Sequence, residues 1–290
     1  MALDWTLLQF LAPAIVASLI IAGIHAYLGL HVVERGVIFV DLSLAQIASL
    51  GATLALLVPA FAGDPHHPGV YWMSLGFTFI GAAIFSIVKG HNARVPQEAI
   101  IGISYAVASA AVIVAMSQST GESEHLRDML VGNILSVSWE DVWKTAGVYV
   151  AIGAFHFVFR KRFLLISMNP AAAEASGISV RFWDFLFYAS FGVVVTRSVA
   201  IAGVLLVFCY LIVPSVAGML YANRVGPRLT LGWVMGGLTS MVGMYLSVVF
   251  DLPTGATIVC TFGGVLALMA AARPWLLRGL GTGGAERHVE

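Results

Sequence analysis

Charged residues are scarce in this sequence. Only 10% of its 290 residues are Asp, Glu, Lys or Arg, whereas about 25% is usual for a soluble domain. Hydrophobic residues make up 59% of the chain. This shortage of charge argues against a soluble protein and predicts a single membrane-embedded domain over residues 1–290. The formal net charge is zero, so we expect membrane lipid around the chain and no nucleic-acid partner.

Cysteines and catalytic motifs are also few. Cys209 and Cys260 lie in apolar runs without metal-ligand or redox spacing, so we interpret both as core packing residues. The sequence contains no H-E-x-x-H, G-x-S-x-G or P-loop motif, which argues against an intramembrane enzyme and against ATP hydrolysis by this chain. The first residues lack the basic segment of a secretory signal, and we expect none.

Hydrophobic runs dominate what is present, and about nine are long enough to matter, because a span needs roughly 17–25 residues. They are Leu7–Leu28, Val37–Ala60, Val70–Val88, Ala99–Ser117, Val142–Phe159, Phe182–Thr196, Val199–Tyr221, Leu229–Phe250 and Gly255–Ala272. The run that begins at Phe182 is short, so a re-entrant bend around Arg197 is an alternative that leaves eight spans. We therefore predict an all-α, polytopic transmembrane helix bundle. The polar tail at 278–290 is expected to fray.

The distribution of Lys and Arg predicts the orientation, since short cytoplasmic loops are enriched in these residues. A nine-span arrangement places most of them on one side: Arg35, Lys89, Arg94, Arg160, Lys161, Arg162, Arg181, Arg224, Arg228, Arg273, Arg278 and Arg287. Arg127, Lys144 and Arg197 fall on the other side. This bias places the N-terminus outside and the C-terminus in the cytoplasm.

A short helix is predicted between two spans, over residues 169–177. Pro170 suits the first turn of a helix, where its missing N–H would have no partner. Asn169 can cap the free N–H groups, and Glu174 suits the positive end of the helix dipole. Gly177 stands where the helix would end. Basic residues flank the segment, which predicts a cytoplasmic helix that a partner protein could contact.

Four segments carry a family resemblance. They read N-P-A-A-A-E-A-S-G-I (Asn169–Ile178), A-G-V-L-L-V-F-C-Y-L-I-V-P-S (Ala202–Ser215), E-A-I-I-G-I (Glu98–Ile103) and L-V-G-N-I-L-S-V-S (Leu130–Ser138). In this order they resemble D-P-x-x-A-x-x-x-G-L, V-G-x-L-L-V-x-x-x-L-I-x-P-A, E-x-x-I-G-I and L-F-G-N-I-L-x-V-S, which occur in permease subunits of zinc/manganese-type ABC importers. The resemblance covers most of the chain.

The resemblance implies a type II-like ABC importer permease of the bacterial cytoplasmic membrane. It implies a homodimer of permeases, ABC ATPase subunits that bind ATP and Mg²⁺, and a periplasmic or extracellular metal-binding protein. The chain itself would bind no cofactor. The substrate would be a divalent transition metal ion, zinc or manganese, moved by alternating access. The residues that couple to the ATPase would be Asn169, Pro170, Ala173, Glu174 and Gly177.

The second span departs from the family pattern, which reads G-D-A-L-S-H-A-V-L-P-G and offers an Asp and a His one helical turn apart. With the two segments aligned on Gly51, Gln46 stands at the His position, Leu42 at the Asp position and Asp41 one place earlier. Five residues correspond to about 140° between side-chain directions on a regular helix. We therefore expect Asp41 and Gln46 not to hold one ion jointly, and the ion to follow a weak, largely hydrated route.

Three residues are candidates for the translocation path: His25, Asp41 and Gln46. An ionisable group inside the membrane is costly and therefore a functional candidate. Each has a structural alternative. Asp41 could instead be satisfied by Arg35 or a backbone group, Gln46 could form an interhelical hydrogen bond, and His25 could be a core histidine.

Two outer loops, Gly63–Gly69 and Gly121–Asp128, carry side chains that bind Zn²⁺ or Mn²⁺ in other proteins. The candidate ligands are Asp64, His66, His67, Glu122, Glu124, His125 and Asp128. We call His66, His67 and His125 the outer-loop histidines. The alternative is that both loops are ordinary solvated loops with docking charges.

Beyond a zinc or manganese importer, the sequence leaves three other functions to weigh. The transported species could be iron or a metal chelate. The chain could be an ATP-independent secondary transporter, although no internal repeat is visible. An intramembrane enzyme is disfavoured by the missing catalytic motifs.

Overall fold

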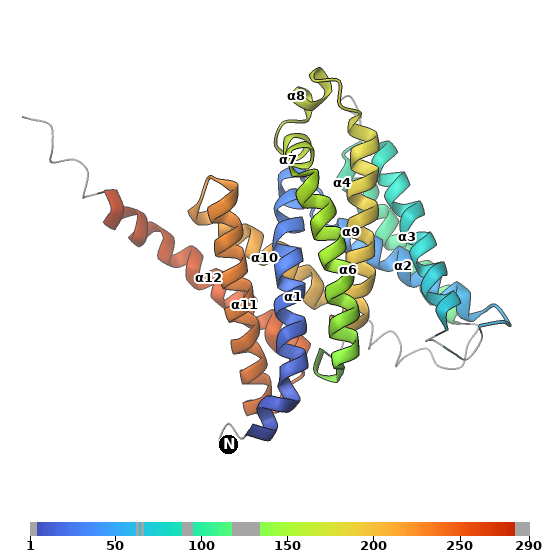
Figure 1. Ribbon diagram of the computed structural model, residues 1–290, viewed down its shortest axis with the longest axis horizontal. Coiled ribbons are helices and arrows are strands. Elements are labelled where there is room, and N and C mark those ends of the chain that lie inside the picture. Colours follow the sequence, from blue (N-terminus) through green and yellow to red (C-terminus); the bar gives the residue numbers. More distant parts are fainter. Residues whose placement is uncertain (1–4, 62–63, 65–66, 89–94, 118–133, 282–290) are drawn as a thin grey trace, which may run out of the picture.

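The computed structural model describes residues 5–61, 64, 67–88, 95–117 and 134–281, with residues 5–8 and 275–281 described by their backbone alone. Within these ranges the chain is helical and contains no strand (Figure 1). The longer helices are α1 (Trp5–Arg35), α2 (Val40–Leu56), α3 (Pro68–Val88), α4 (Gln97–Met116), α6 (Trp139–Val158), α9 (Val180–Ala202), α10 (Val204–Tyr221), α11 (Val225–Phe250) and α12 (Thr254–Gly281). The shorter ones are η1 (Ile134–Ser136), α7 (Arg160–Met168) and α8 (Pro170–Ala175).

The number of spans is close to the predicted nine, for which eight was the alternative. Among the described residues, 7 helices are long and apolar enough to cross a membrane, and the bent pair α6 and α7 raises this to 8. The axis turns by 74° between α6 and α7. The remaining apolar helix, α2, is shorter than these spans at 17 residues. Each predicted hydrophobic run therefore falls mainly on one helix, although Val199–Tyr221 begins in the last turn of α9 and continues in α10. The all-α transmembrane bundle is confirmed.

The predicted alternative of a bend at Arg197 is wrong. Helix α9 continues through Arg197 and ends at Ala202. The chain instead breaks at Gly203, whose φ of 76° favours glycine because a Cβ would be strained there. Arg197 is tolerated within the helix because α6 supplies partners: its Nη2 lies 3.3 Å from Asp141 Oδ1 and its Nε donates to Thr145 Oγ1 at 3.1 Å.

Two further expectations need correction. The C-terminal helix α12 extends to Gly281, so the first four residues of the predicted tail are helical. The rest of that tail lies outside the described residues. Cys260 is exposed on α12 and is no core residue, whereas Cys209 is half-buried. An apolar run cannot tell a core face from a lipid-facing one, because both are hydrophobic in a membrane.

Helices α1 and α10 approach each other closely at Gly29. A Cβ at this position would overlap the backbone of Leu211 and the hydroxyl of Ser215. The Ser215 Oγ donates to Leu211 O at 2.9 Å within α10. Small residues at such crossings let helix backbones pack without a hydrophobic driving force. Helix α11 packs against both α1 and α10, while α2 packs with α3, α4 and α9.

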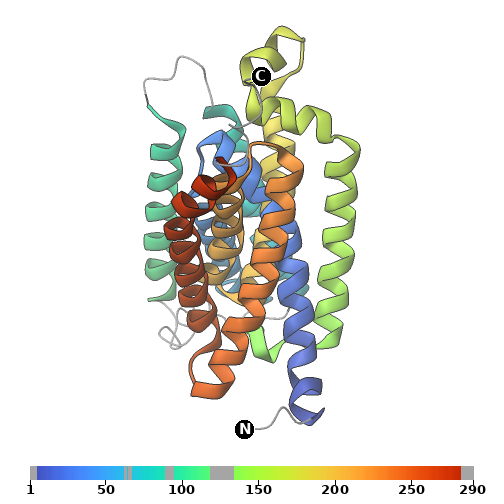
Figure 2. The ribbon, with the colours of Figure 1, turned by 90° about the vertical axis from the view of Figure 1, so that its left-hand side faces the viewer.

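The two ends of the bundle are distinct (Figure 2). The first turn of α1 lies at one end. The bend between α6 and α7, helix α8 and the last turns of α12 lie toward the other. The two terminal helices therefore approach opposite membrane surfaces.

Candidate functional site

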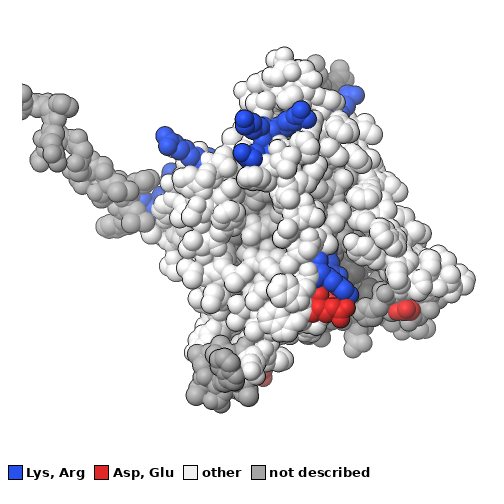
Figure 3. All heavy atoms as spheres, in the orientation of Figure 1, with Lys and Arg blue, Asp and Glu red and all other residues white. Residues whose placement is uncertain are grey.

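Charged side chains gather differently at the two ends (Figure 3). Cations cluster at the end that carries α7 and α8, where the sequence supplies Arg160, Lys161, Arg162 and Arg181. At the other end, Lys144 and Arg197 stand beside acids, because Lys144 pairs with Glu140 and Arg197 with Asp141. An excess of Lys and Arg marks the cytoplasmic side. The α7–α8 end is therefore cytoplasmic and the start of α1 is outside.

Helix α8 is a short projection from this cytoplasmic end (Figure 1). Asn169 caps it, because its side-chain oxygen accepts a hydrogen bond from Ala172 N at 3.0 Å. Pro170 occupies the first turn. Past the last residue of α8, Gly177 takes a φ of 75°, and Ile178 N donates to Ala173 O at 3.1 Å. These are the local features that the sequence predicted.

One face of α8 is anchored and the other is open. Ala173 is fully buried, with 0% exposure. Glu174, Ala175 and Ser176 are exposed. Among the predicted coupling residues, Ala173 is therefore buried on the side of α8 that packs toward α7 and α9, whereas Asn169, Glu174 and Gly177 are exposed.

A buried polar network lies beneath α8, and sequence reasoning missed it. We call His31, Arg35, Ser167 and Asp184 the cytoplasmic network. Arg35 forms an ion pair with Asp184, and the exposed fractions of the two side chains are 1% and 0%. Arg35 Nε also donates to Ser167 Oγ at 2.8 Å, and His31 Nδ1 lies 2.8 Å from the same oxygen. The network joins α1, α7 and α9.

Aromatic rings enclose this network. The guanidinium carbon of Arg35 lies 4.1 Å from the ring centre of Phe187, in a cation–π arrangement. The rings of Tyr27 and His31 meet edge to face at 4.8 Å. Polar and aromatic contacts together join α1, α7 and α9 at the base of α8. A displacement of α7 would therefore also displace α1 and α9. Asp184 could have pointed to this network from the sequence, because it is an acidic residue near the cytoplasmic start of an apolar run.

Helix α2 buries the two path candidates that it carries. Asp41 is 1% exposed and Gln46 6% exposed. Asp41 Oδ1 has no hydrogen-bond partner among the described residues. Near the start of α2, Phe39 N donates to Glu98 Oε1 of α4 at 3.0 Å, and Asp41 follows two residues later. Because Arg35 forms its ion pair with Asp184, it does not neutralise the Asp41 carboxylate.

His25 does not join the two α2 residues. It is fully buried on α1, its Nδ1 lies 2.9 Å from Ile21 O, and its ring meets that of Tyr149 on α6 edge to face at 6.4 Å. The Nε2 atom has no hydrogen-bond partner among the described residues. His25 thus faces α6, whereas Asp41 lies near α4, and the three path candidates form no single cluster.

The outer-loop candidates are only partly described. His66, Glu122, Glu124, His125 and Asp128 lie outside the described residues. His67 accepts a hydrogen bond at Nδ1 from Gly69 N at 3.0 Å, and its ring stacks on Phe61 at 4.8 Å. Asp64 O accepts from His67 N at 3.1 Å. Across the described ranges, no group of three or more His, Cys, Asp or Glu is placed to hold a metal ion.

Comparisons with known proteins agree on one family. The sequence profile of the ABC 3 transport family matches residues 7–273. The "Manganese transport system membrane protein MntC" of Halalkalibacterium halodurans is 27% identical over 267 residues, which are 90% of this chain and 86% of that protein. A "Probable iron transport system membrane protein" of Haemophilus influenzae is 26% identical over 260 residues, 88% of this chain and 92% of its own length.

Solved structures show the same fold. A chain of PsaBC from Streptococcus pneumoniae, solved in complex with Fab, superposes with a TM-score of 0.73 at 24% sequence identity, covering 90% of this chain and 92% of its own. An inward-facing conformation of a putative metal-chelate type ABC transporter gives a TM-score of 0.70 at 18% identity, covering 93% and 90%.

Proposed function

The chain belongs to the ABC 3 transport family, and from this we propose that it is the membrane subunit of an ATP-driven importer for a divalent transition metal ion, manganese or zinc. Members of this family are transport subunits of bacterial membranes and not enzymes. The observation that carries the proposal is α8, a capped helix held at the cytoplasmic end with one face buried and the other exposed.

The proposed mechanism is alternating access driven from α8. Two copies of the chain, related by a two-fold axis, would enclose the pathway. An ABC ATPase, which carries ATP and Mg²⁺, would press on the exposed face of each α8. Because α7 and α9 are tied to α1 by the cytoplasmic network, this force would reach the spans. A soluble metal-binding protein would deliver the ion at the outer end.

The choice of transported ion rests on the names of the relatives and on the positions of the polar residues of α2. Relatives with manganese in their names match 87% to 93% of this chain, and one named for iron matches 88%. Iron or a metal chelate is therefore the alternative cargo. Separated path candidates favour a weak, hydrated transit route, since a transport site must also release its ion. Asp41, as the buried carboxylate of α2, would guide the cation along this route.

Exchange of exposed charge on α8 tests the proposal. Glu174→Arg reverses a charge on the exposed face without touching buried Ala173. After coexpression with its ABC ATPase, the purified variant should carry at least about tenfold less bound ATPase than the wild type. The reason is that one mispaired charge at a contact costs about 1.4 kcal/mol or more of binding free energy. Glu140→Arg is the matched control, since Glu140 is an exposed acid at the opposite end.

Two outcomes would contradict the proposal. Full retention of the ATPase by Glu174→Arg, with an unchanged elution profile of the permease, would remove α8 from the coupling surface. Metal transport by the permease with no ATPase present would identify an ATP-independent transporter.

A further inference from the structure

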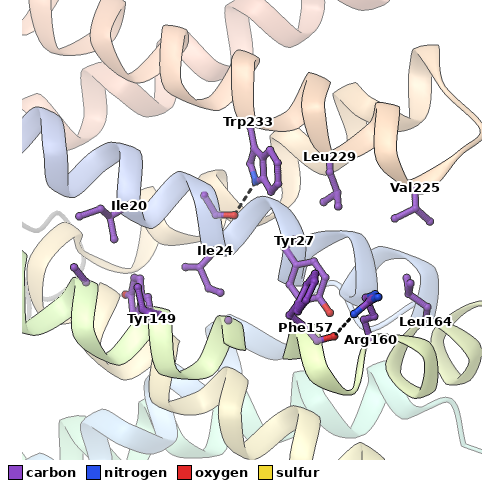
Figure 4. A pocket seen from close by; sticks show the side chains of 14 residues that line it. Ile20, Ile24, Tyr27, Tyr149, Phe157, Arg160, Leu164, Val225, Leu229 and Trp233 are labelled. Carbon is purple, nitrogen blue, oxygen red and sulfur yellow. Dashed lines mark hydrogen bonds between the residues drawn. The ribbon is translucent and has the colours of Figure 1, made fainter. Parts of the chain in front are cut away.

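A cavity of about 570 Å³ lies on the side of the bundle, between α1, α6, α7 and α11 (Figure 4). Its walls are almost wholly apolar, with Ile20, Ile24, Phe157, Leu229 and Trp233 among the lining residues. Trp233 and Phe157 are 48% and 66% exposed. The cavity therefore opens toward the surroundings of the bundle, which for a membrane-spanning chain is lipid.

The cavity runs along one leaflet. On α6 the lining residues extend from Ala146 to Phe157, a distance of about 17 Å at 1.5 Å per residue. Arg160 stands at the cytoplasmic bend into α7. Half of a bilayer's hydrocarbon core is about 15 Å thick. The cavity therefore spans the cytoplasmic leaflet, from the headgroup level to near the bilayer centre.

Polar groups are concentrated at the cytoplasmic end of this cavity. Arg160 makes one hydrogen bond within the described residues, from Nη1 to Phe157 O at 2.9 Å, and its guanidinium lies 4.3 Å from the centre of the Phe157 ring. The Tyr27 hydroxyl is buried and has no hydrogen-bond partner in the described chain. Figure 4 shows this hydroxyl directed toward the end of the cavity where Arg160 lies. Lys161 and Arg162 follow on α7.

The size of the cavity argues against a helix of a second copy as its occupant. A helix with side chains is about 10 Å across, so 17 Å of helix fills roughly 1,300 Å³. This is more than twice the cavity of about 570 Å³. A flexible hydrocarbon chain is narrow enough to enter, and the cavity volume is typical of small-molecule sites.

We propose that this cavity binds an anionic phospholipid of the cytoplasmic leaflet. One acyl chain lies along α1, α6 and α11, the phosphate contacts Arg160, and an oxygen of the headgroup or ester accepts from the Tyr27 hydroxyl. Basic pockets between transmembrane helices on the cytoplasmic side are suited to anionic headgroups. Three consecutive cations at 160–162 favour a lipid with net negative charge over a zwitterionic one.

The chain offers matched variants for a test. Gly153 lines the cavity, and a Cβ there would meet no atom within 4 Å. Gly153→Leu therefore adds a side chain at the cavity wall, and its Cβ overlaps no neighbouring atom. Gly147 lies on the same helix with equally open space but does not line the cavity, so Gly147→Leu is its control. Arg160→Gln removes the headgroup contact, and Lys161→Gln removes the same charge one residue away.

Native mass spectrometry of the full-length protein, titrated with phosphatidylglycerol and with phosphatidylcholine, measures the binding. We expect preferential retention of phosphatidylglycerol. Gly153→Leu should reduce retention of both lipids at least about tenfold, while Gly147→Leu should retain them. Arg160→Gln should lower the preference for phosphatidylglycerol about fivefold, and Lys161→Gln should lower it by clearly less.

Several results would overturn the proposal. One is equal lipid retention by the Gly153→Leu variant and the wild type, and another is equal binding of the two lipids by the wild type. Full displacement of phosphatidylglycerol by soluble glycerol phosphate would assign the site to a free phosphate. A Gly153→Leu protein that loses oligomer mass but keeps its lipid would assign the cavity to a second copy of the chain.

Discussion

The ion pair between Arg35 and Asp184 should be the costliest polar contact to break in this protein. Both side chains are almost completely buried, at 1% and 0% exposure. Loss of one partner leaves a buried charge without compensation, which costs about 3–5 kcal/mol. In Asp184→Leu, the Arg35 guanidinium keeps its contacts with Ser167 and the Phe187 ring. These contacts offset part of the cost, so we expect a loss of about 3 kcal/mol.

A double-mutant cycle separates this cost from simple packing. The variants are Asp184→Leu, Arg35→Met and the pair together, and the free energy of unfolding is measured in mixed micelles. The double variant removes both charges and should recover most of the loss, because apolar replacement of a buried pair is often neutral. Lys144→Met is the control, since Lys144 and Glu140 are 62% and 75% exposed and such pairs contribute about 0.3–0.5 kcal/mol. Equal losses in Asp184→Leu and Lys144→Met, or a double variant that loses the sum of the single losses, would refute this reasoning.

Three other predictions concern packing, the transit route and the outer loops. Gly29→Ala should lower the free energy of unfolding by about 1–3 kcal/mol, because the added Cβ overlaps α10, whereas Gly23→Ala, with no atom within 4 Å of its Cβ, should not lower it. In uptake assays Asp41→Ala should cost more than Gln46→Ala, and Gln46→His should slow metal release by adding a ligand about two turns into α2. Complete loss of uptake in a folded Gln46→Ala protein would contradict the weak route. Replacement of the outer-loop histidines by Ala should weaken uptake mainly at low metal concentration, and an unchanged metal titration would favour ordinary solvated loops.

The spans and the cytoplasmic helix could be predicted because their signals are local. A span is a continuous apolar run, which composition reveals directly. Helix α8 is bounded by Asn169, Pro170 and Gly177, each of which acts on the backbone within a few residues. The break between α9 and α10 was also local, at Gly203. It was assigned instead to Arg197 because a cation in an apolar run suggests a loop, and its partner Asp141 lies 56 residues away.

The cytoplasmic network could not be predicted from a single sequence. Its hydrogen bonds and ion pair join residues that are 132 to 149 positions apart. No spacing rule relates such residues, and only the packing of α1, α7 and α9 brings them together. The same limit applies to the lateral cavity, whose lining residues come from four helices. For the path candidates on α2 the five-residue interval between Asp41 and Gln46 predicts different directions on a regular helix, and the joint binding of an ion by the two side chains stays a matter for the uptake assays.

ATP-driven metal accumulation in proteoliposomes tests the central claim most directly. The permease would be reconstituted with its ABC ATPase and its external metal-binding protein, and Mn²⁺ and Zn²⁺ inside the vesicles would be measured over time. The account predicts accumulation of a divalent ion against its gradient when ATP is hydrolysed. It predicts none with a non-hydrolysable analogue or with Glu174→Arg on α8. Accumulation driven by an ion gradient without the ATPase, or ATP-driven uptake that excludes every divalent transition metal ion, would contradict it.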